Sequence, residues 1–144
     1  MKLSTRARYG IRAMVELAQN EGKGPLQIKA IGQHQEISIK YLEQLLAILK
    51  SGGFVRSVRG AKGGYMLADA AKKIRLSDVF NCLEGPLVTT ECLEDNDYCP
   101  KAADCVTRDL WAEVQTAVKK VLDSFTLEDL VEKAKTKKNM DYQI

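Results

Sequence analysis

Three of the four cysteines lie within fourteen residues of one another, at Cys92, Cys99 and Cys105. Thiolates this close in sequence can converge on a metal ion or an iron–sulfur cluster, or they can undergo reversible oxidation. Their pattern, C-x6-C-x5-C, lacks the paired C-x2-C that is typical of a zinc ribbon. We therefore predict that these residues bind an iron–sulfur cluster or act as thiol sensors, rather than form structural disulfides.

A cluster held by three cysteines needs a further ligand, because such clusters normally take four. His34, the one histidine of the chain, is distant in sequence from the cysteines. Water, another molecule or a nearby carboxylate remain as candidates, the carboxylates being those of Glu91, Glu94, Asp95, Asp97, Asp104 and Asp109. A weak fourth ligand would make the cluster labile, which suits a sensor better than an electron carrier.

The elements that surround the cysteine segment can be predicted from the hydrophobic pattern of the chain. The first half of the chain has a strong helical pattern. Apolar residues recur every three to four positions in three segments, which predicts helices over residues 4–21, 26–35 and 39–51. Glycines follow the first and third segments, and Ser38 is a good N-cap for the third. Two short helices joined by a tight turn, the second with a polar outer face, are typical of a helix-turn-helix.

A β-hairpin is predicted directly after these helices. Two short apolar strands, at residues 54–58 and 65–67, flank a basic, glycine-rich loop at residues 59–64. The glycines of this loop permit positive φ angles and close backbone approach to a ligand. Such a hairpin after a helix-turn-helix is the wing of a winged helix domain, so the predicted fold is mainly helical with a small β-hairpin wing.

The second half of the chain is predicted to hold a short helix, the cysteine segment and a long helix. Ser77 is expected to cap the short helix, in which Cys82 is a small core residue. From about Thr107 the apolar residues step by three and four positions, as in a coiled coil; they are Trp111, Val114, Val118, Val121 and Phe125. We expect this long helix to form a dimer interface, Thr126 to cap a last short helix, and the polar tail from Lys135 to fray.

The predicted domain boundary follows residue 76. Residues 1–76 would form the winged helix-turn-helix, and residues 77–144 a linker helix, the cysteine-containing loop and the dimerisation helix. Residues 1–80 carry 14 Lys and Arg against 6 Asp and Glu, whereas residues 81–144 carry 8 against 13. A basic N-terminal half indicates a polyanionic partner, and double-stranded DNA is the one that a winged helix fits.

The helix over residues 39–51 is predicted to read base edges in the major groove, and the wing to reach an adjacent minor groove or its phosphates. Residues at the start of the chain are expected to contact backbone phosphates. The predicted DNA-binding residues are Lys2, Arg6, Arg8, Ser38, Lys40, Tyr41, Glu43, Gln44, Arg59 and Lys62. Because a two-fold dimer doubles these contacts, the expected target is a pseudo-palindromic operator.

Other classes of function have little support in the sequence. No nucleophile–base pair and no phosphate-binding glycine-rich loop before a helix can be recognised, so the chain is not expected to be an enzyme. The apolar runs are too short to span a bilayer, and the basic start of the chain lacks the apolar core of a signal peptide. We expect a cytoplasmic protein with no membrane partner.

Several short motifs together resemble the Rrf2 family of bacterial repressors. These motifs are residues 2–10 (KLSTRARYG), 37–38 (IS), 41–45 (YLEQL), 59–65 (RGAKGGY) and 83–86 (LEGP). The resemblance runs over nearly the whole chain. It implies a homodimer with a long C-terminal dimerisation helix, DNA contacts from residues 38–44, and a minor-groove arginine at Arg59.

The resemblance extends to two different branches of the family. Regulators of iron–sulfur biogenesis use three cysteines that correspond to Cys92, Cys99 and Cys105 to hold a 2Fe–2S cluster. They have a histidine three residues after the last cysteine, where this chain has Arg108. Residues 122–124 (LDS) and 126–130 (TLEDL) look more like the cysteine-metabolism repressors, which lack the three cysteines and act with cysteine synthase as a partner.

Two hypotheses follow. In the first, an iron–sulfur cluster repositions the cysteine loop and changes the angle between the DNA-binding domains of a repressor of iron–sulfur or sulfur metabolism genes. In the alternative, a cluster-free repressor of cysteine metabolism responds to a sulfur-metabolism enzyme or to thiol oxidation.

Overall fold

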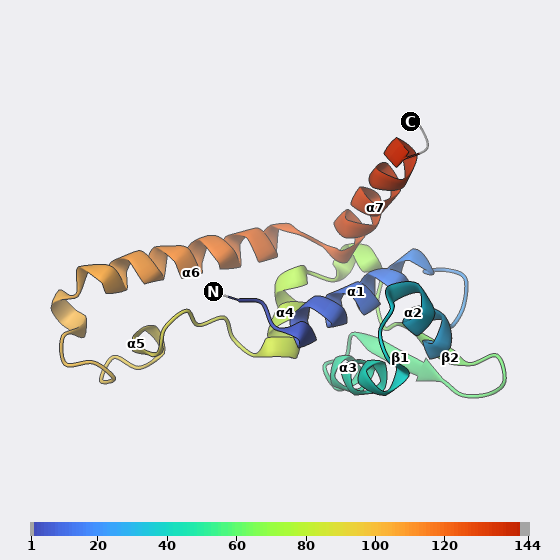
Figure 1. Ribbon diagram of the computed structural model, residues 1–144, viewed down its shortest axis with the longest axis horizontal. Coiled ribbons are helices and arrows are strands. Elements are labelled where there is room, and N and C mark those ends of the chain that lie inside the picture. The colour runs from blue at the N-terminus through green and yellow to red at the C-terminus, as the bar shows by residue number, and fades with distance from the viewer. Residues whose placement is uncertain (1, 142–144) are drawn as a thin grey trace.

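The computed structural model describes residues 2–141, most of which are helical (Figure 1). In chain order the elements are α1 (Thr5–Gln19), α2 (Ile28–Gln35), α3 (Ile39–Ser51), β1 (Val55–Val58), β2 (Gly64–Leu67), η1 (Ala71–Lys73), α4 (Leu76–Glu84), α5 (Glu91–Glu94), η2 (Ala102–Asp104), α6 (Val106–Ser124) and α7 (Leu127–Asp141). A mainly helical chain with one small hairpin confirms the predicted fold class. Met1 and residues 142–144, which the predicted domains include, lie outside the described residues.

Side-chain caps define where the first helices begin. The Ser4 hydroxyl accepts a hydrogen bond of 3.0 Å from the Ala7 N–H, and the Ser38 hydroxyl accepts one of 3.2 Å from the Tyr41 N–H. Ser38 is therefore the N-cap of α3, as predicted. Helix α2 begins at Ile28, later than predicted, because the backbone of Leu26 pairs instead with the hairpin.

The N-terminal core forms where α1, α3, α4 and α7 meet. Its largest fully buried side chains are Met14, Ile31, Leu42, Leu45, Leu46, Leu49, Leu127 and Val79. Full burial of one such side chain stabilises the fold by roughly 1.5–3 kcal/mol, so this cluster supplies most of the cohesion of the N-terminal half. The apolar face of α3 packs into this core, and its polar face is exposed to solvent.

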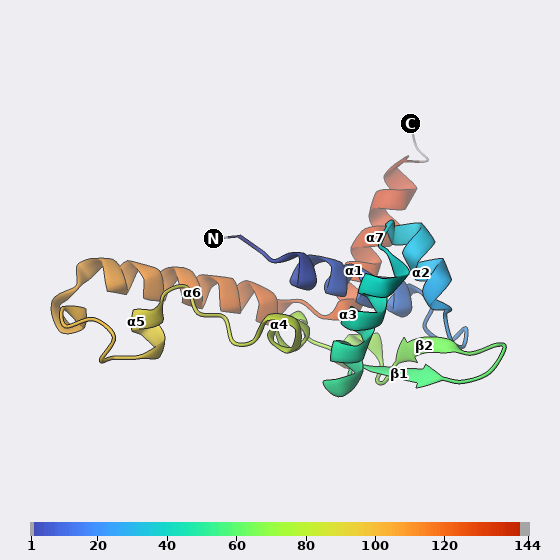
Figure 2. The same cartoon turned by 60° about the horizontal axis from the view of Figure 1, so that its bottom comes forward.

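Two antiparallel strands form the wing, with Val55 opposite Leu67 and Val58 opposite Gly64. A Cβ atom at Gly63 would collide with the Val58 carbonyl, so this position requires glycine. The hairpin is attached to the helices by two backbone hydrogen bonds of 2.8 Å between Leu26 and Tyr65. It is thus anchored at its base, while its tip projects from the molecule (Figure 2).

The prediction that Ser77 caps α4 is wrong. The helix begins at Leu76, and Ser77 is buried within its first turn. The N-terminal end of α4 is held by backbone pairing, because the Leu76 N–H donates to the Phe125 carbonyl at 2.9 Å and the Leu127 N–H donates to the Ile74 carbonyl at 2.8 Å. The chain between α6 and α7 therefore supplies the partner that a capping side chain would otherwise provide.

The C-terminal helices run in two different directions (Figure 1). Helix α6 extends away from the core beside the segment that carries α5, and none of its residues is buried. Helix α7 returns to pack on α1, with Leu127 and Val131 buried. Thr126 caps α7 as predicted, accepting from the Asp129 N–H at 3.2 Å, whereas the prediction of a short helix with a frayed tail from Lys135 is wrong because α7 continues to Asp141.

Candidate DNA interface and cysteine loop

The polar face of α3 is open to solvent. Ser38, Lys40, Glu43 and Gln44 are exposed, and Tyr41 is half-buried. The opposite face of the helix is fully packed, so these five side chains have a fixed spacing on a rigid support. Lys40 carries a positive charge, and Glu43 and Gln44 carry the hydrogen-bonding groups that suit base edges. The structure thus gathers the residues predicted for the major groove on one surface.

Tyr41 is held in place by Tyr9 of α1. Their ring centroids are 6.1 Å apart and the ring planes meet at 82°, an edge-to-face contact. The guanidinium groups of Arg8 and Arg12 lie over the Tyr9 ring, at 5.6 and 5.0 Å from its centroid. Sequence reasoning missed Tyr9 and Arg12, although their spacing of three places both on one side of a helix.

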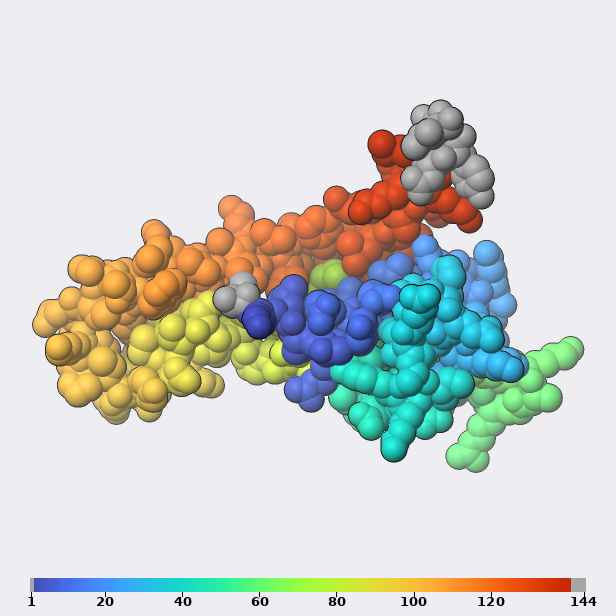
Figure 3. All heavy atoms as spheres, viewed as in Figure 1, coloured from blue at the N-terminus to red at the C-terminus, as the bar shows by residue number. Residues whose placement is uncertain are grey.

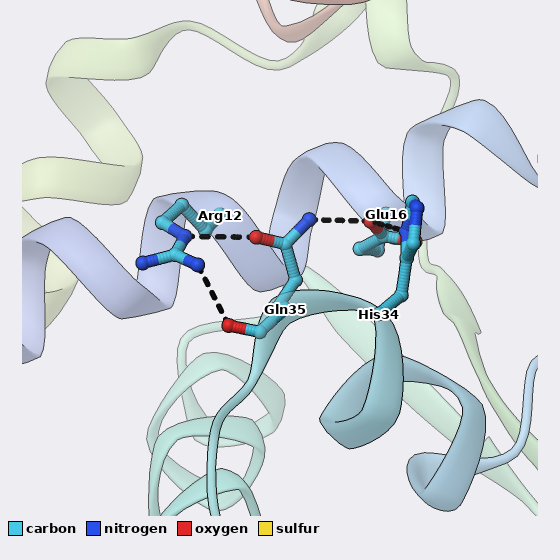
Figure 4. A network of polar contacts seen from close by, with 4 residues as sticks. All are labelled: Arg12, Glu16, His34 and Gln35. Carbon is cyan, nitrogen blue, oxygen red and sulfur yellow. Dashed lines mark hydrogen bonds and ion pairs between the residues drawn. The ribbon is translucent and has the colours of Figure 1, made fainter.

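A second set of contacts, shown in Figure 4, joins α1 to the end of α2. Arg12 donates to the side-chain oxygen of Gln35 at 2.8 Å and to its backbone oxygen at 2.7 Å. The Gln35 amide and His34 Nδ1 both contact the carboxylate of Glu16, which is buried. The turn that follows needs Glu36 at a φ of 55°, and the polar network fixes the residues just before it.

The wing contributes two predicted residues, Arg59 and Lys62, and both are exposed. The Lys50 ammonium of α3 donates a hydrogen bond of 2.8 Å to the Ser57 hydroxyl of β1. This contact links the end of α3 to the wing. Both elements lie on the lower side of the molecule in Figure 1, away from α7.

The basic residues at the start of the chain, Lys2, Arg6 and Arg8, are also exposed. Arg6 is partly engaged within the chain, because its Nε lies 3.9 Å from a carboxylate oxygen of Glu84 on α4. The same carboxylate accepts a hydrogen bond from the Ser4 hydroxyl. Among the described residues, Arg8 has no carboxylate within ion-pair distance, and its guanidinium lies over the Tyr9 ring.

Helix α6 presents apolar side chains to solvent. Trp111 is 41% exposed and Val121 57% exposed, while Val114 and Val118 are half-buried. A groove of about 700 Å³ runs between α6 and α1, lined by Leu3, Ala7, Arg8, Ile11, Phe80, Ala117, Val118, Val121 and Leu122. Phe125 lies just beyond the end of α6, is half-buried and packs against the N-terminal core.

The cysteine loop is defined here as residues 92–105. Cys92 lies in α5, Cys99 in the following turn and Cys105 at the N-cap of α6, and all three are half-buried and free. Hydrogen bonds from the Thr107 side chain and the Arg108 backbone lower the pKa of Cys105, whereas burial raises the pKa of Cys82. Within residues 2–141, no three His, Cys, Asp or Glu side chains already stand at metal-ligating separation.

Arg108 joins the two ends of the cysteine loop. Its guanidinium donates to the Cys92 carbonyl at 3.2 and 3.0 Å and to the side-chain oxygen of Asn96 at 2.7 Å. A guanidinium remains protonated and cannot ligate a metal. Thiolates are the usual ligands of iron–sulfur clusters, so the three cysteines are chemically suited to hold one. Arg108 does not supply a fourth ligand.

Comparison with known proteins identifies the chain. The Rrf2 profile, described as an iron-dependent transcriptional regulator, matches residues 3–133. The chain belongs to the Rrf2 family. This Rrf2-family chain is a DNA-binding transcriptional regulator by its relationship to helix-turn-helix regulators.

Individual Rrf2 relatives cover nearly all of the chain. Protein rrf2 of Nitratidesulfovibrio vulgaris is 44% identical over 134 residues, which are 93% of this chain and 89% of the relative. CymR of Bacillus subtilis, a global cysteine regulator, is 45% identical, and its structure gives a TM-score of 0.79 over 92% of this chain and 97% of CymR. IscR of T. potens is 40% identical, with a TM-score of 0.77 over 93% of this chain and 88% of IscR.

No helix in the described part of the chain has both the length and the apolar character needed to cross a membrane.

Proposed function

We propose that this regulator binds a pseudo-palindromic operator as a homodimer, with α3 as the recognition helix in each major groove and the hairpin β1–β2 as the wing. One observation supports this most directly: α3 and the wing lie on the same side of the molecule (Figure 3), and the polar residues of α3 and the basic residues of the wing tip are exposed. Ser38 to Gln44 then face base edges and phosphates, and Arg59 and Lys62 reach the neighbouring minor groove.

Dimerisation follows from the surface of α6. A long helix that exposes Trp111 and Val121 beside an apolar groove leaves a large apolar area in water. A second copy of the chain, placing its own α6 along this groove, covers that area symmetrically. Two copies bring two recognition helices to one face, as binding to adjacent half-sites about 34–36 Å apart requires.

The test of this part is stoichiometry on DNA. An operator is obtained by selection from random duplexes, and complexes are analysed by sedimentation and footprinting. We expect two protomers per duplex and two protected half-sites about one helical turn apart. One protomer per duplex with a single protected segment would overturn the dimeric reading.

We also propose that the signal that controls DNA binding is sensed by the cysteine loop. Cys92, Cys99 and Cys105 would hold a 2Fe–2S cluster, with water, a carboxylate or another molecule in the fourth position. When bound, the cluster supplies a group that responds to iron supply and to oxidants. The residues of the chain then transmit its presence: Cys105 begins α6, so any movement of the loop is passed directly to the proposed dimerisation helix.

Anaerobic reconstitution tests the cluster. Protein is incubated with ferrous iron and sulfide, desalted, and analysed for visible absorption, iron and acid-labile sulfide. We expect about two iron and two sulfide per protomer. The Cys99→Ser variant should lose the visible spectrum, whereas Cys82→Ser, which removes a thiol outside the cysteine loop, should keep it. A colourless wild-type protein would overturn the cluster.

The second candidate is a cluster-free repressor of cysteine metabolism, controlled by thiol oxidation or by a sulfur-metabolism enzyme. It is supported by the guanidinium of Arg108 at the loop and by the similarity to CymR, the cysteine regulator of Bacillus subtilis. In that case oxidant changes DNA affinity in iron-free protein, and Cys99→Ser abolishes the change. Capture of a sulfur-metabolism enzyme from an extract would favour the partner-controlled form.

A further inference from the structure

The two ends of the cysteine loop are connected by hydrogen bonds from one side chain. Cys92 lies at the start of the loop in α5, and Cys105 is the residue that precedes the first turn of α6. Arg108, one turn into α6, donates twice to the Cys92 carbonyl and once to Asn96. The side chain thus spans from α6 to two separate points of the preceding segment.

We propose that Arg108 is the clasp of the cysteine loop: a positioning residue that holds the backbone of Cys92 against α6. Arginine suits this task because its planar guanidinium offers several donors in a fixed fork and stays charged. Arg108 bonds to two acceptors at once, the Cys92 carbonyl sixteen positions earlier in the chain and the Asn96 side chain twelve positions earlier. The clasp therefore restricts both α5 and the segment after it. The charge strengthens each of these hydrogen bonds.

Neighbouring contacts support the same role. The Thr90 hydroxyl lies 3.0 Å from Cys92 Sγ, and the Thr107 hydroxyl lies 3.2 Å from Cys105 Sγ. Upstream of the loop, the Thr89 N–H donates to Gln115 of α6 at 3.0 Å. The first and last cysteines are therefore each oriented by a hydroxyl, and the chain just before the loop is attached to α6 as well.

The clasp has a consequence for ligand uptake. Closing a loop costs conformational entropy, and a loop closed before a ligand arrives does not pay that cost during binding. Because Arg108 ties the Cys92 backbone to the first turn of α6, which Cys105 precedes, part of this closure is made before a ligand binds. The ligand of the loop rests on the proposed function, whereas the clasp consists of hydrogen bonds between residues of this chain.

Hydrogen exchange in the full-length, reduced, metal-free protein tests the clasp. We expect Arg108→Ala to raise the exchange rate of amides between residues 92 and 97 by about tenfold. Arg108→Lys, which keeps the charge but loses the fork, should raise it less. Lys119→Ala, an exposed substitution on the same helix, is the matched control and should leave the rate unchanged. Alkylation of Cys92 should accelerate in parallel, while alkylation of Cys82 stays constant.

A second variant distinguishes local loss of the clasp from general unfolding. Asn96→Ala removes one acceptor from an exposed turn, and it should raise exchange in the same segment without altering the amides of α3. Unchanged exchange and unchanged Cys92 alkylation in Arg108→Ala and Asn96→Ala would overturn the clasp. This result is independent of DNA binding and of cluster formation, because neither DNA nor iron is present.

The link to the ligand is then measured separately. Wild-type protein reconstituted with iron and sulfide should retain its iron through gel filtration, and Arg108→Ala should lose it several times faster. Equal retention by the two proteins would restrict the clasp to the metal-free state and overturn its role in ligand uptake. A wild-type protein that takes up no iron contradicts the proposed cluster, and the exchange measurement still decides the clasp.

Discussion

The ring of Tyr9 on α1 meets the ring of Tyr41 on α3 edge to face, with centroids 6.1 Å apart. Tyr41 lies in the first turn of α3, whose N-cap is Ser38. This contact therefore fixes the start of the proposed recognition helix against α1, a helix of the N-terminal core. The side chains that face DNA in the proposed complex are pre-positioned by packing between α1 and α3.

Loss of the aromatic contact should weaken DNA binding. Such a pair contributes about 0.5–1.5 kcal/mol, so Tyr9→Leu is expected to raise the Kd for a selected operator by about two- to tenfold. Fluorescence anisotropy with labelled duplex measures the change. Tyr98→Leu, which alters an exposed tyrosine in the cysteine loop, is the control. Full affinity in Tyr9→Leu would mean that α3 needs no support from α1.

Arg59 is expected to contribute specific binding energy. Its side chain is exposed at the wing tip, and Arg59→Ala should weaken binding to the selected operator by about 1–3 kcal/mol. The same substitution should weaken binding to unrelated duplex by less. Lys138→Ala removes a positive charge from α7, on the opposite side of the molecule, and should have little effect. Equal losses from both substitutions would indicate that only total charge matters.

The polar network around Glu16 should stabilise the helix-turn-helix. Glu16→Ala leaves the Gln35 amide without its acceptor, and we expect the free energy of unfolding to fall by about 1–3 kcal/mol. Urea denaturation followed by circular dichroism gives this value. His34→Ala removes a side chain that is 72% exposed, so a loss below about 1 kcal/mol is expected. A larger loss from His34 than from Glu16 contradicts this assignment.

An acidic residue in the proposed interface should separate the protomers. Val121 is 57% exposed in the single chain and lines the groove beside α6. Val121→Asp should leave the fold intact, because the position is exposed, yet place a charge where a second copy is expected to pack. Sedimentation should then show monomers, whereas Lys119→Asp should remain dimeric. A Val121→Asp protein that remains dimeric would show that the dimer interface lies elsewhere on the chain.

The two kinds of cysteine should differ in their pH profiles. Hydrogen bonds from Thr107 and Arg108 lower the pKa of Cys105 and stabilise its thiolate, whereas burial raises the pKa of Cys82. As pH rises, alkylation of Cys105 should therefore begin below the pH typical of a free thiol, and that of Cys82 above it. Mass spectrometry of iodoacetamide-treated, metal-free protein resolves the two sites. Thr107→Val should move the Cys105 profile to higher pH.

Much of the N-terminal half could be predicted because its signals are local. The leucine pattern and the Ser38 cap define α3, and the basic glycine-rich loop defines the wing. The prediction for Ser77 was wrong because the start of α4 depends on a distant segment, where the Leu76 N–H donates to the Phe125 carbonyl. Helix α7 packs on α1 through its first turns, with Leu127 and Val131 buried, and it continues to Asp141 although residues 135–140 are exposed. Its polar composition therefore did not mark where the helix ends.

The candidate site shows the same division between residues that local signals predict and residues that depend on long-range contacts. Exposed residues of α3 and the wing follow from periodicity, since one face of the helix is apolar. Tyr9, Arg12 and Arg108 act through partners in other elements, and a sequence pattern does not pair them. The separation of the three cysteines in the folded chain is likewise set by a loop without periodicity, where local preferences are weak.

The dependence of operator affinity on salt tests the central claim most directly. If two protomers engage the phosphate backbone through the basic side chains beside α3 and the wing, about six phosphates are neutralised, and the plot of log K against log salt concentration should have a slope of about −5. The monomeric Val121→Asp protein should give about half that slope. An affinity that does not change with salt would contradict DNA binding by this surface.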